Sequence, residues 1–176
     1  MSVWILWLIL FAGFVTGCVS SKKYYAAIQS GNAREVKAAL DQGMDPNETD
    51  RDGKSWLAIA AYEDAKGDVV ALLLDHGADP KIQTDDGTTA LDMAVIKKHA
   101  PAVQLLLDRG ADPNNIDKRG STALHKAVRY NSFEITRMLV DQGADTQIKD
   151  EKGRTPFDYA VERGNKKIIN LLKSRN

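Results

Sequence analysis

Three histidines and one cysteine are the side chains of this chain that most often bind metals or attack substrates. The histidines, His76, His99 and His125, lie far apart in the sequence, whereas a zinc site needs closely spaced ligands. The Asp-Pro and Asp-Gly pairs lack the alternating oxygen ligands and the glutamate of a calcium loop. No Cys-x-x-Cys pair, phosphate-binding glycine loop or nucleophile motif occurs. We therefore predict no catalytic residue, no metal and no cofactor, and expect that the protein is not an enzyme.

The single cysteine, Cys18, follows an apolar leader. Residues 1–17 contain no charged side chain and include a run of large apolar residues at 3–11. This run is short for a membrane-spanning helix, which takes roughly 20 residues, but it suits the apolar core of a secretory signal. The segment Val15-Thr16-Gly17-Cys18 resembles the lipobox of bacterial lipoproteins. In that family the cysteine thiol receives a diacylglyceryl group and a peptidase cuts just before it.

This resemblance implies a signal peptide at residues 1–17 that is removed, and a lipidated Cys18 with a short tether at 18–23. We then expect a protein anchored by lipid to a membrane of the bacterial envelope and facing the periplasm. One feature departs from the lipoprotein pattern, because Lys22 and Lys23 follow the apolar run and no lysine or arginine precedes it. An uncleaved inner-membrane anchor, which would leave the chain in the cytoplasm, therefore stays open as an alternative.

The composition is that of a folded protein without a bias toward nucleic acid. Hydrophobic residues make up 43% and charged residues 27% of the 176 residues, and 24 basic side chains balance 24 acidic ones. Nucleic-acid binders concentrate basic charge, so we expect no nucleic-acid partner. One cysteine cannot form an intramolecular disulfide, and this count leaves the compartment open.

Glycines recur at a fixed period after the leader, which is the signature of a repeat protein. The first series is spaced by 34, 33 and 33 residues and consists of Gly43, Gly77, Gly110 and Gly143. The second series has the same spacing and consists of Gly53, Gly87, Gly120 and Gly153. Three more glycines lie near the middle of a repeat, at Gly31, Gly67 and Gly164.

Each period predicts two helices joined by turns. An apolar stretch such as 69–74 precedes each glycine of the first series, where glycine supplies the left-handed residue that ends a helix. Threonines such as Thr89 and Thr122 follow the second series and can cap the next helix by accepting hydrogen bonds from its free N–H groups. Pro156 suits a first helical position. The repeat is therefore turn, helix, short link, helix and loop.

This pattern resembles ankyrin repeats. The segments that align with the family's Thr-Pro-Leu-His-x-Ala are Ser55-Trp56-Leu57-Ala58-Ile59-Ala60, Thr89-Ala90-Leu91-Asp92-Met93-Ala94, Thr122-Ala123-Leu124-His125-Lys126-Ala127 and Thr155-Pro156-Phe157-Asp158-Tyr159-Ala160. The resemblance implies an all-α solenoid of stacked helix-turn-helix units with β-turn or hairpin tips. The ankyrin-repeat domain is expected at 24–176, with an N-terminal helix pair at 24–47, repeats at about 50–83, 84–116 and 117–149, and a C-terminal cap at 150–176.

The aligned segments also show departures from the family. Only His125 keeps the family histidine, whose ring bonds the backbone of the turn in ankyrin repeats, so we expect a structural role for it. Asp92 and Asp158 stand in two other repeats and are able to bond there, whereas Ala58 is not. His76 precedes a helix-ending glycine, and His99 is expected in an exposed link between helices. The first full repeat carries one extra residue between 63 and 67.

Stacked repeats present an extended concave surface for a partner. In ankyrin repeats this surface consists of the turn tips and the exposed side of the first helix of each pair. The residues that map there and are predicted to bind a partner are Arg51, Lys54, Tyr62, Asp85, Asp86, Ile96, Lys118, Arg119, Arg129, Tyr130, Lys152 and Arg154. Tyrosine and arginine often anchor interfaces. The charge changes from acidic to basic along the stack, so a partner with an acidic patch would associate faster.

The leading hypothesis is a monomeric, membrane-held module that binds one or more partner proteins of unknown identity, as an immunity or accessory factor of the envelope. A small-molecule or haem carrier that uses His99 or His125 is one alternative. A cytoplasm-facing scaffold on an uncleaved anchor is another.

Overall fold

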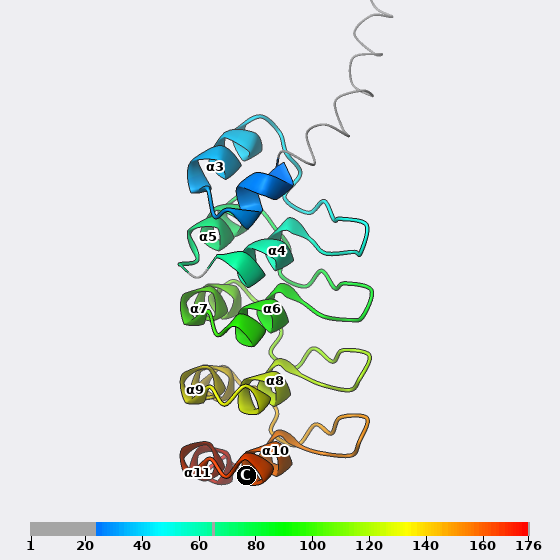
Figure 1. Ribbon diagram of the computed structural model, residues 1–176, viewed down its shortest axis with the longest axis vertical. Helices are drawn as coiled ribbons and strands as arrows, with labels where there is room; N and C mark the ends of the chain where they lie inside the picture. The colour runs from blue at the N-terminus through cyan, green and yellow to red at the C-terminus, as the bar shows by residue number, and fades with distance from the viewer. Residues whose placement is uncertain (1–23, 65, 176) are drawn as a thin grey trace, which may run out of the picture.

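The computed structural model describes residues 24–64 and 66–175, which form a stack of helix pairs with loops projecting to one side (Figure 1). Within these ranges the expected all-α solenoid is confirmed, since helices are joined by loops and the only extended pairing is an isolated antiparallel bridge between Thr49 and Ser55. The predicted signal, the tether and Cys18 lie outside the described residues. No helix of the described part is both long and apolar enough to cross a membrane.

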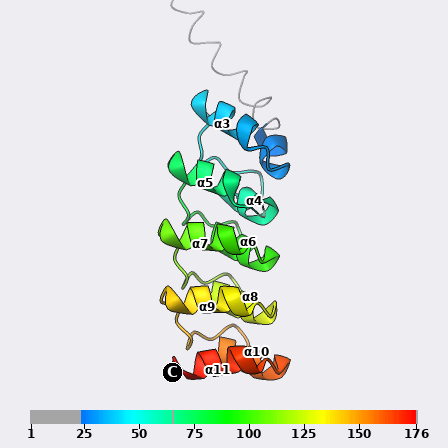
Figure 2. The ribbon, with the colours of Figure 1, turned by 90° about the vertical axis from the view of Figure 1, so that its left-hand side faces the viewer.

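The helices form two rows that run along the stack, as the two side views show (Figures 1 and 2). The inner row consists of residues 24–29, α4 (Trp56–Glu63), α6 (Ala90–Lys97), α8 (Ala123–Arg129) and α10 (Pro156–Arg163). The outer row consists of α3 (Ala33–Asp41), α5 (Asp68–Asp75), α7 (Ala100–Asp108), α9 (Phe133–Asp141) and α11 (Lys166–Lys173). Each helix packs on its partner in the pair and on the same helix of the next pair.

The inner helices begin where the sequence predicts, at hydroxyl caps. The Thr122 hydroxyl accepts from the backbone N–H of His125 at 3.4 Å, and the His125 ring in return accepts from the Thr122 N–H at 3.2 Å. Such a reciprocal capping box satisfies two helix-terminal donors at once. Asp92 and Asp158 form the same box with Thr89 and Thr155, as expected. In α4 the cap is Ser55, whose hydroxyl accepts from the N–H of Ala58 at 3.2 Å.

The link between the helices of a pair contains a left-handed residue in most pairs. Lys98, Asn131 and Gly164 occupy this position with φ of 61°, 57° and 67°. The first full repeat differs in where this residue lies, because its left-handed residue is Gly67, with φ of 84°, directly before α5. Asp64, which follows α4, has φ of −90° and turns its buried carboxylate toward the start of α5. That carboxylate accepts from the N–H of Val69 at 2.7 Å, so the longer link of this repeat is compensated by a side-chain cap.

The core repeats as regularly as the sequence. One alanine of each inner helix is fully buried, at Ala60, Ala94, Ala127 and Ala160. One leucine of each outer helix from α5 to α11 is fully buried as well, at Leu73, Leu106, Leu139 and Leu172. Alanine lets the inner helices approach closely, and leucine fills the space between the rows, so the apolar surface of each pair is covered by its neighbours.

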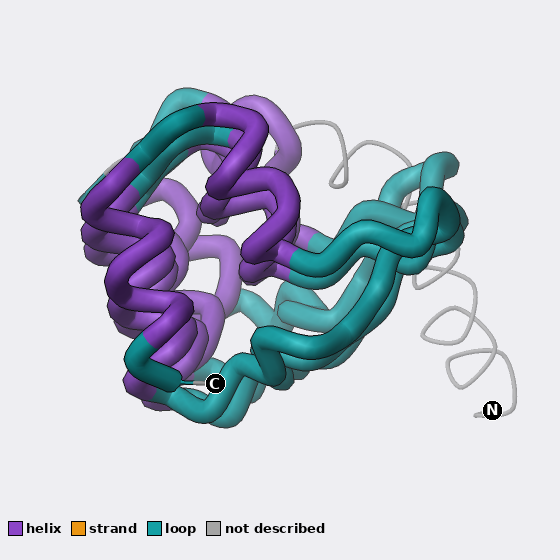
Figure 3. The backbone as a smooth tube through the Cα atoms, turned by 90° about the horizontal axis from the view of Figure 1, so that it is seen from below, coloured by secondary structure: helices purple, strands orange, loops and turns teal. Residues whose placement is uncertain are grey.

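The loops between pairs extend away from the inner row as fingers, at 49–54, 83–88, 116–121 and 149–154 (Figures 1 and 3). Each finger is closed by a backbone hydrogen bond of the same kind, such as Asp117 N to Ser121 O at 3.1 Å. Neighbouring fingers are also joined, because Lys118 N donates to Asp86 O and Glu151 N donates to Arg119 O, both at 2.9 Å. These bonds hold the later fingers as a connected layer.

Gly120 is the tightest point of this layer. Its φ is +71°, and a Cβ at this position would lie 2.9 Å from the backbone nitrogen of Glu151. Gly143 has a similar φ of +84° but has open space where its Cβ would be. The two glycines therefore separate the cost of the backbone conformation from the cost of the close approach.

Gly143→Ala should lower the free energy of unfolding by about 1 kcal/mol, which is the cost of a left-handed alanine. Gly120→Ala should cost at least about 2 kcal/mol, because the finger must also move away from Glu151. Urea unfolding followed by circular dichroism measures both. Equal losses for the two variants would show that the fingers do not resist separation.

Candidate binding face

The twelve residues predicted to bind a partner lie on the fingers and on the inner helices, and we call this surface the groove face. Finger residues are Arg51, Lys54, Asp85, Asp86, Lys118, Arg119, Lys152 and Arg154, and residues at the inner helices are Tyr62, Ile96, Arg129 and Tyr130. Lys54, Ile96 and Arg154 are partly buried, and the other nine are exposed. Each finger connects directly to an inner helix (Figure 3), so the finger residues and the inner-helix residues form adjoining parts of one surface. Their role in binding stays a prediction.

A hollow of about 300 Å³ lies on the groove face near its N-terminal end. Its lining comes from the first finger and from three neighbouring inner helices, and consists of Tyr25, Gln29, Lys54, Ala58, Ile59, Tyr62, Glu63 and Met93. The Tyr25 ring packs edge-on against Trp56 at 6.3 Å, and Lys97 Nζ lies 4.4 Å from the centre of the Tyr62 ring. The hollow therefore has aromatic walls and a largely apolar floor.

At the C-terminal end of the groove face, one tyrosine ring organises two arginines. Tyr159 donates its hydroxyl hydrogen to the carboxylate of Asp150 at 2.5 Å and accepts a hydrogen bond from Arg154. The guanidinium of Arg154 lies 4.0 Å from the centre of the Tyr159 ring, and that of Arg129 lies 5.7 Å from it. Arg154 also pairs with Glu162 at 3.2 Å. The ring is thus a fixed platform for Arg129, which was a predicted site residue.

This network shifts the pKa of both partners of the short hydrogen bond. Burial alone would raise the pKa of Asp150, but hydrogen bonds from Tyr159 and from the N–H groups of Arg154 and Lys152 hold it below the usual value. Burial and the hydrogen bond to Asp150 raise the pKa of the Tyr159 hydroxyl. Asp150 therefore stays charged and Tyr159 neutral over the physiological pH range, which keeps the platform intact.

Lys126 is the residue of this face that the sequence reasoning missed. Its ammonium lies 2.9 Å from Asp92 Oδ1 and 2.8 Å from Asp117 Oδ2, and it donates to the carbonyl of Ser121 at 3.4 Å. Only 9% of the Lys126 side chain and 1% of the Asp92 side chain are exposed. A buried cation between two carboxylates joins α6, α8 and a finger. The signal in the sequence was a lysine at the variable position of Thr122–Ala127, where the other repeats carry isoleucine, methionine and tyrosine.

His125 explains why Lys126 is needed. His125 accepts from Thr122 through Nδ1, and its Nε2 donates to the carbonyl of Arg154 in the following finger at 3.1 Å. Asp92, which occupies the histidine position one repeat earlier, caps its helix but has no hydrogen to give to the next finger. Lys126 supplies that hydrogen, since it bonds both Asp92 and the Ser121 carbonyl that corresponds to Arg154. Burial lowers the pKa of His125, so its ring stays neutral.

The histidines do not converge on a ligand site. His76 caps α5 as expected, with its ring Nδ1 2.8 Å from the carbonyl of Leu72. His99 is partly buried, so the expectation of an exposed position is wrong, and its Nδ1 lies 3.2 Å from the carbonyl of Ala61. Within residues 24–64 and 66–175, no group of three or more His, Cys, Asp or Glu side chains is arranged to hold a metal ion.

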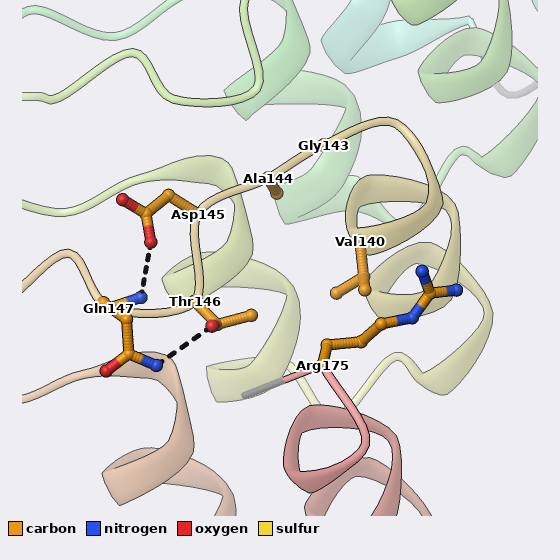
Figure 4. Close-up of a pocket in the computed structure, with 7 residues that line it drawn as sticks. All are labelled: Val140, Gly143, Ala144, Asp145, Thr146, Gln147 and Arg175. Atoms are coloured by element: carbon orange, nitrogen blue, oxygen red, sulfur yellow. Dashed lines mark hydrogen bonds between the residues drawn. The ribbon is translucent and has the colours of Figure 1, made fainter.

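Another hollow lies away from the groove face, between the last loop and the end of α11 (Figure 4). It measures about 490 Å³, is widely open, and is lined by Val140, Gly143, Ala144, Asp145, Thr146, Gln147 and Arg175. The polar groups there bond within the loop, since Asp145 accepts from the Gln147 N–H at 2.8 Å and Gln147 Nε2 lies 3.1 Å from Thr146 Oγ1. Arg175 pairs with Asp141 at 2.7 Å. We therefore read this hollow as a gap between packed elements and keep the groove face as the candidate site.

Comparison with known proteins confirms the resemblance to ankyrin repeats. The family model described as "Ankyrin repeats (3 copies)" matches residues 24–117 and 109–176. The human "SH3 and multiple ankyrin repeat domains protein 1" is 35% identical over 83 residues, which cover 47% of this chain and 4% of that protein. The pea "BTB/POZ domain and ankyrin repeat-containing protein COCH" is 46% identical over 69 residues, which cover 38% of this chain and 14% of that protein. The chain thus spans a small part of the length of these relatives.

Lys126→Met should lower the free energy of unfolding by about 3 kcal/mol, because Asp92 and Asp117 would keep their buried carboxylates without a cation. Lys166→Met, at an exposed position of α11, is the control and should stay within about 0.5 kcal/mol of wild type. Urea unfolding measures both, and equal midpoints would contradict a stabilising role for Lys126. Adding Asp92→His to Lys126→Met should recover part of the loss, because an imidazole can donate to the Ser121 carbonyl.

Proposed function

The chain belongs to the ankyrin-repeat family, and from this premise we propose that it binds a partner protein through the groove face. The observation that carries the proposal is a set of exposed tyrosines and arginines at positions that the stack does not use. Tyr62 is 38% and Tyr130 is 44% exposed, and Arg129 lies beside Tyr130. Aromatic and arginine side chains supply much of the energy of protein interfaces. A rigid surface that carries them loses little conformational entropy on binding.

We propose binding without catalysis and as a monomer. Members of this family generally act as interaction modules and not as enzymes. The charged networks of the groove face support binding without catalysis, because these charges have structural partners: Lys126 pairs with Asp92 of the preceding repeat, and Arg154 and Asp150 bond Glu162 and Tyr159 of their own repeat. The ring nitrogens of His125 are both engaged by protein atoms, which argues against haem ligation by this residue.

We further propose that a lipid on Cys18 holds the protein at a bacterial envelope membrane, with the stack in the periplasm. This proposal rests on the apolar leader and the Val15-Thr16-Gly17-Cys18 segment. An envelope-held binding module suits an immunity factor that neutralises a toxin or an accessory factor that recruits an enzyme. Several acyl chains would give stable anchoring, since each buried CH₂ contributes about 0.8 kcal/mol.

The groove face can be tested by crosslinking in cells, affinity capture and mass spectrometry. Wild type should yield an abundant partner that is reduced at least about tenfold with Tyr62→Ala, Arg129→Ala and Tyr130→Ala combined, because this variant removes the proposed anchors. Arg34→Ala with Arg137→Ala, on the exposed side of the outer helices, is the control and should retain the partner. Both variants should unfold near the wild-type temperature. Equal capture by all three proteins would refute binding through this face.

The anchor is tested by the intact mass of the protein purified from membranes of a bacterial host. Loss of residues 1–17 with the added mass of acyl chains is expected, because the lipoprotein peptidase cuts before the modified cysteine. Cys18→Ser should keep the leader and gain no lipid. An unmodified mass for the wild-type protein would contradict the lipoprotein proposal and support an uncleaved anchor.

A further inference from the structure

We propose that the groove face binds an extended acidic segment of its partner in one direction. An apolar side chain of the segment occupies the hollow between Tyr25 and Tyr62, and acidic side chains lie over Arg129 and its neighbours. The inference rests on the proposed function and adds the chemistry and the polarity of the partner. The acidic character of the segment is inferred from the cations of the groove face that form no ion pair within the protein.

Cations and anions are unevenly distributed along the groove face. The half formed by the last two fingers, α8 and α10 carries eight cationic against five acidic residues, which are Lys118, Arg119, Lys126, Arg129, Lys149, Lys152, Arg154, Arg163, Asp117, Asp150, Glu151, Asp158 and Glu162. The half formed by the first two fingers, α4 and α6 carries three cationic against six acidic residues, which are Arg51, Lys54, Lys97, Asp50, Asp52, Glu63, Asp85, Asp86 and Asp92. A partner segment with acidic residues at one end meets complementary charge in one direction only.

The structure further separates cations that have a carboxylate from cations that have none. Arg154 pairs with Glu162 at 3.2 Å and with Asp150 at 4.0 Å, so its charge is largely used within the protein. Lys118, Arg119, Lys152 and Arg163 are exposed and form no ion pair with any carboxylate in the described part of the chain. These four cations are available to a partner without the loss of an internal bond.

Arg129 has the most defined position among these cations. Its guanidinium lies over the Tyr159 ring, and the ring is held by hydrogen bonds with Asp150 and Arg154. No described carboxylate forms an ion pair with Arg129. An arginine that already rests on an aromatic ring loses less side-chain entropy when a carboxylate binds it than a free surface arginine does. Arg129 is therefore the expected anchor for the acidic end of the segment.

The hollow at the other end of the face suits an apolar side chain. Its volume of about 300 Å³ is enough for a phenylalanine or leucine side chain, and Ala58, Ile59 and Met93 contribute apolar surface. Tyr25 and Tyr62 are 36% and 38% exposed, so a side chain placed between them removes aromatic surface from water. Asp85 and Asp86 lie on the neighbouring finger and disfavour an acidic residue at this end.

The separation of the two features defines the length of the segment. The hollow lies around α4, between residues 24–29 and α6, and Arg129 ends α8, so the two are about two helix spacings apart along the stack. Packed helices lie about 8 to 10 Å apart, which gives roughly 16 to 20 Å. An extended chain advances about 3.3 Å per residue, so about five or six residues connect the apolar side chain to the acidic ones.

The interspersed anions and the apolar hollow favour a peptide over a continuous polyanion. Glu151 and Glu162 stand among the cations, and a nucleic acid or an anionic membrane would place negative charge against them. Neither would fill the aromatic hollow. A short acidic run followed by uncharged residues avoids both problems.

Fluorescence anisotropy with a labelled 12-residue peptide tests the proposal. Two forms of the protein are measured in parallel, the chain from residue 19 onward, which carries no lipid, and the full lipidated protein. The probe carries one phenylalanine and, about five residues further on, four consecutive glutamates. It should bind at least about tenfold tighter than the same peptide with glutamine in place of glutamate. It should also bind tighter than a peptide whose phenylalanine directly precedes the glutamates, because that spacing is too short to join the hollow and Arg129. Affinity should fall as salt is raised.

Charge reversal on the protein locates the site. Lys118→Glu with Arg129→Glu should weaken the acidic peptide at least about tenfold, whereas Arg34→Glu with Arg137→Glu makes the same change in net charge on the outer helices and should have little effect. Met93→Glu should weaken the phenylalanine peptide and not its alanine counterpart. Equal weakening by both double variants, or tighter binding of a single-stranded oligonucleotide or of anionic vesicles than of the peptide, would overturn the inference.

The result is separable from failure of the proposed function. A captured partner that is lost with the alanine variant of the groove face but is unaffected by salt and by Lys118→Glu with Arg129→Glu leaves the proposed function standing and refutes the acidic segment. Failure of wild type to bind any of the peptides likewise refutes the acidic segment alone. Absence of a captured partner refutes the proposed function itself.

Discussion

The stacking of one helix pair on the next is the interaction on which the rest of the structure depends, because no pair covers its apolar surface alone. The fully buried alanines of the inner row and leucines of the outer row recur in each pair from α4 and α5 onward, and each of these helices packs on its neighbours along the stack. A solenoid of this kind is stabilised by each pair and by each seam between pairs. The rigidity of the groove face therefore depends on how tightly neighbouring helix pairs pack.

The polar contacts between neighbouring helix pairs differ from one repeat to the next. His125 carries a hydrogen bond from its own helix cap to the next finger, and Lys126 performs the same task for the preceding seam, where Asp92 replaces the histidine. On the outer side, Arg109 and Arg175 pair with Asp75 and Asp141 of the preceding pair, both at 2.7 Å. The exposed pairs contribute little each, whereas the buried Lys126 bridge is coupled to helix capping. The same packing is thus maintained by different side-chain chemistry in successive repeats.

The positions that these contacts leave free are the ones that carry the proposed function. Tyr62, Tyr130 and Lys118 lie outside the core, and their side chains face solvent on a scaffold that other residues hold. Arg129 belongs partly to the stacking residues and partly to the free residues. The Tyr159 ring fixes its position, while its charge stays available to a partner. The division between stacking residues and free residues explains how one fold presents an apolar, aromatic end and a basic end on the same face.

Interactions between residues close in the sequence determined most of the fold. The tertiary structure decided which charged side chains form ion pairs within the protein. The periodic glycines, the threonine caps and the apolar stretches each act within a few residues, so the helix pairs and their order follow from the sequence alone. The structural role of His125 was expected from the resemblance to ankyrin repeats. The identity of the free cations does not follow from the sequence, because it depends on which carboxylate of another repeat lies within reach. In the sequence, Lys126 reads as an ordinary basic residue and Arg129 as one of several predicted site residues. Only the packed structure buries Lys126 between Asp92 and Asp117 and places Arg129 over Tyr159 with its charge unmatched.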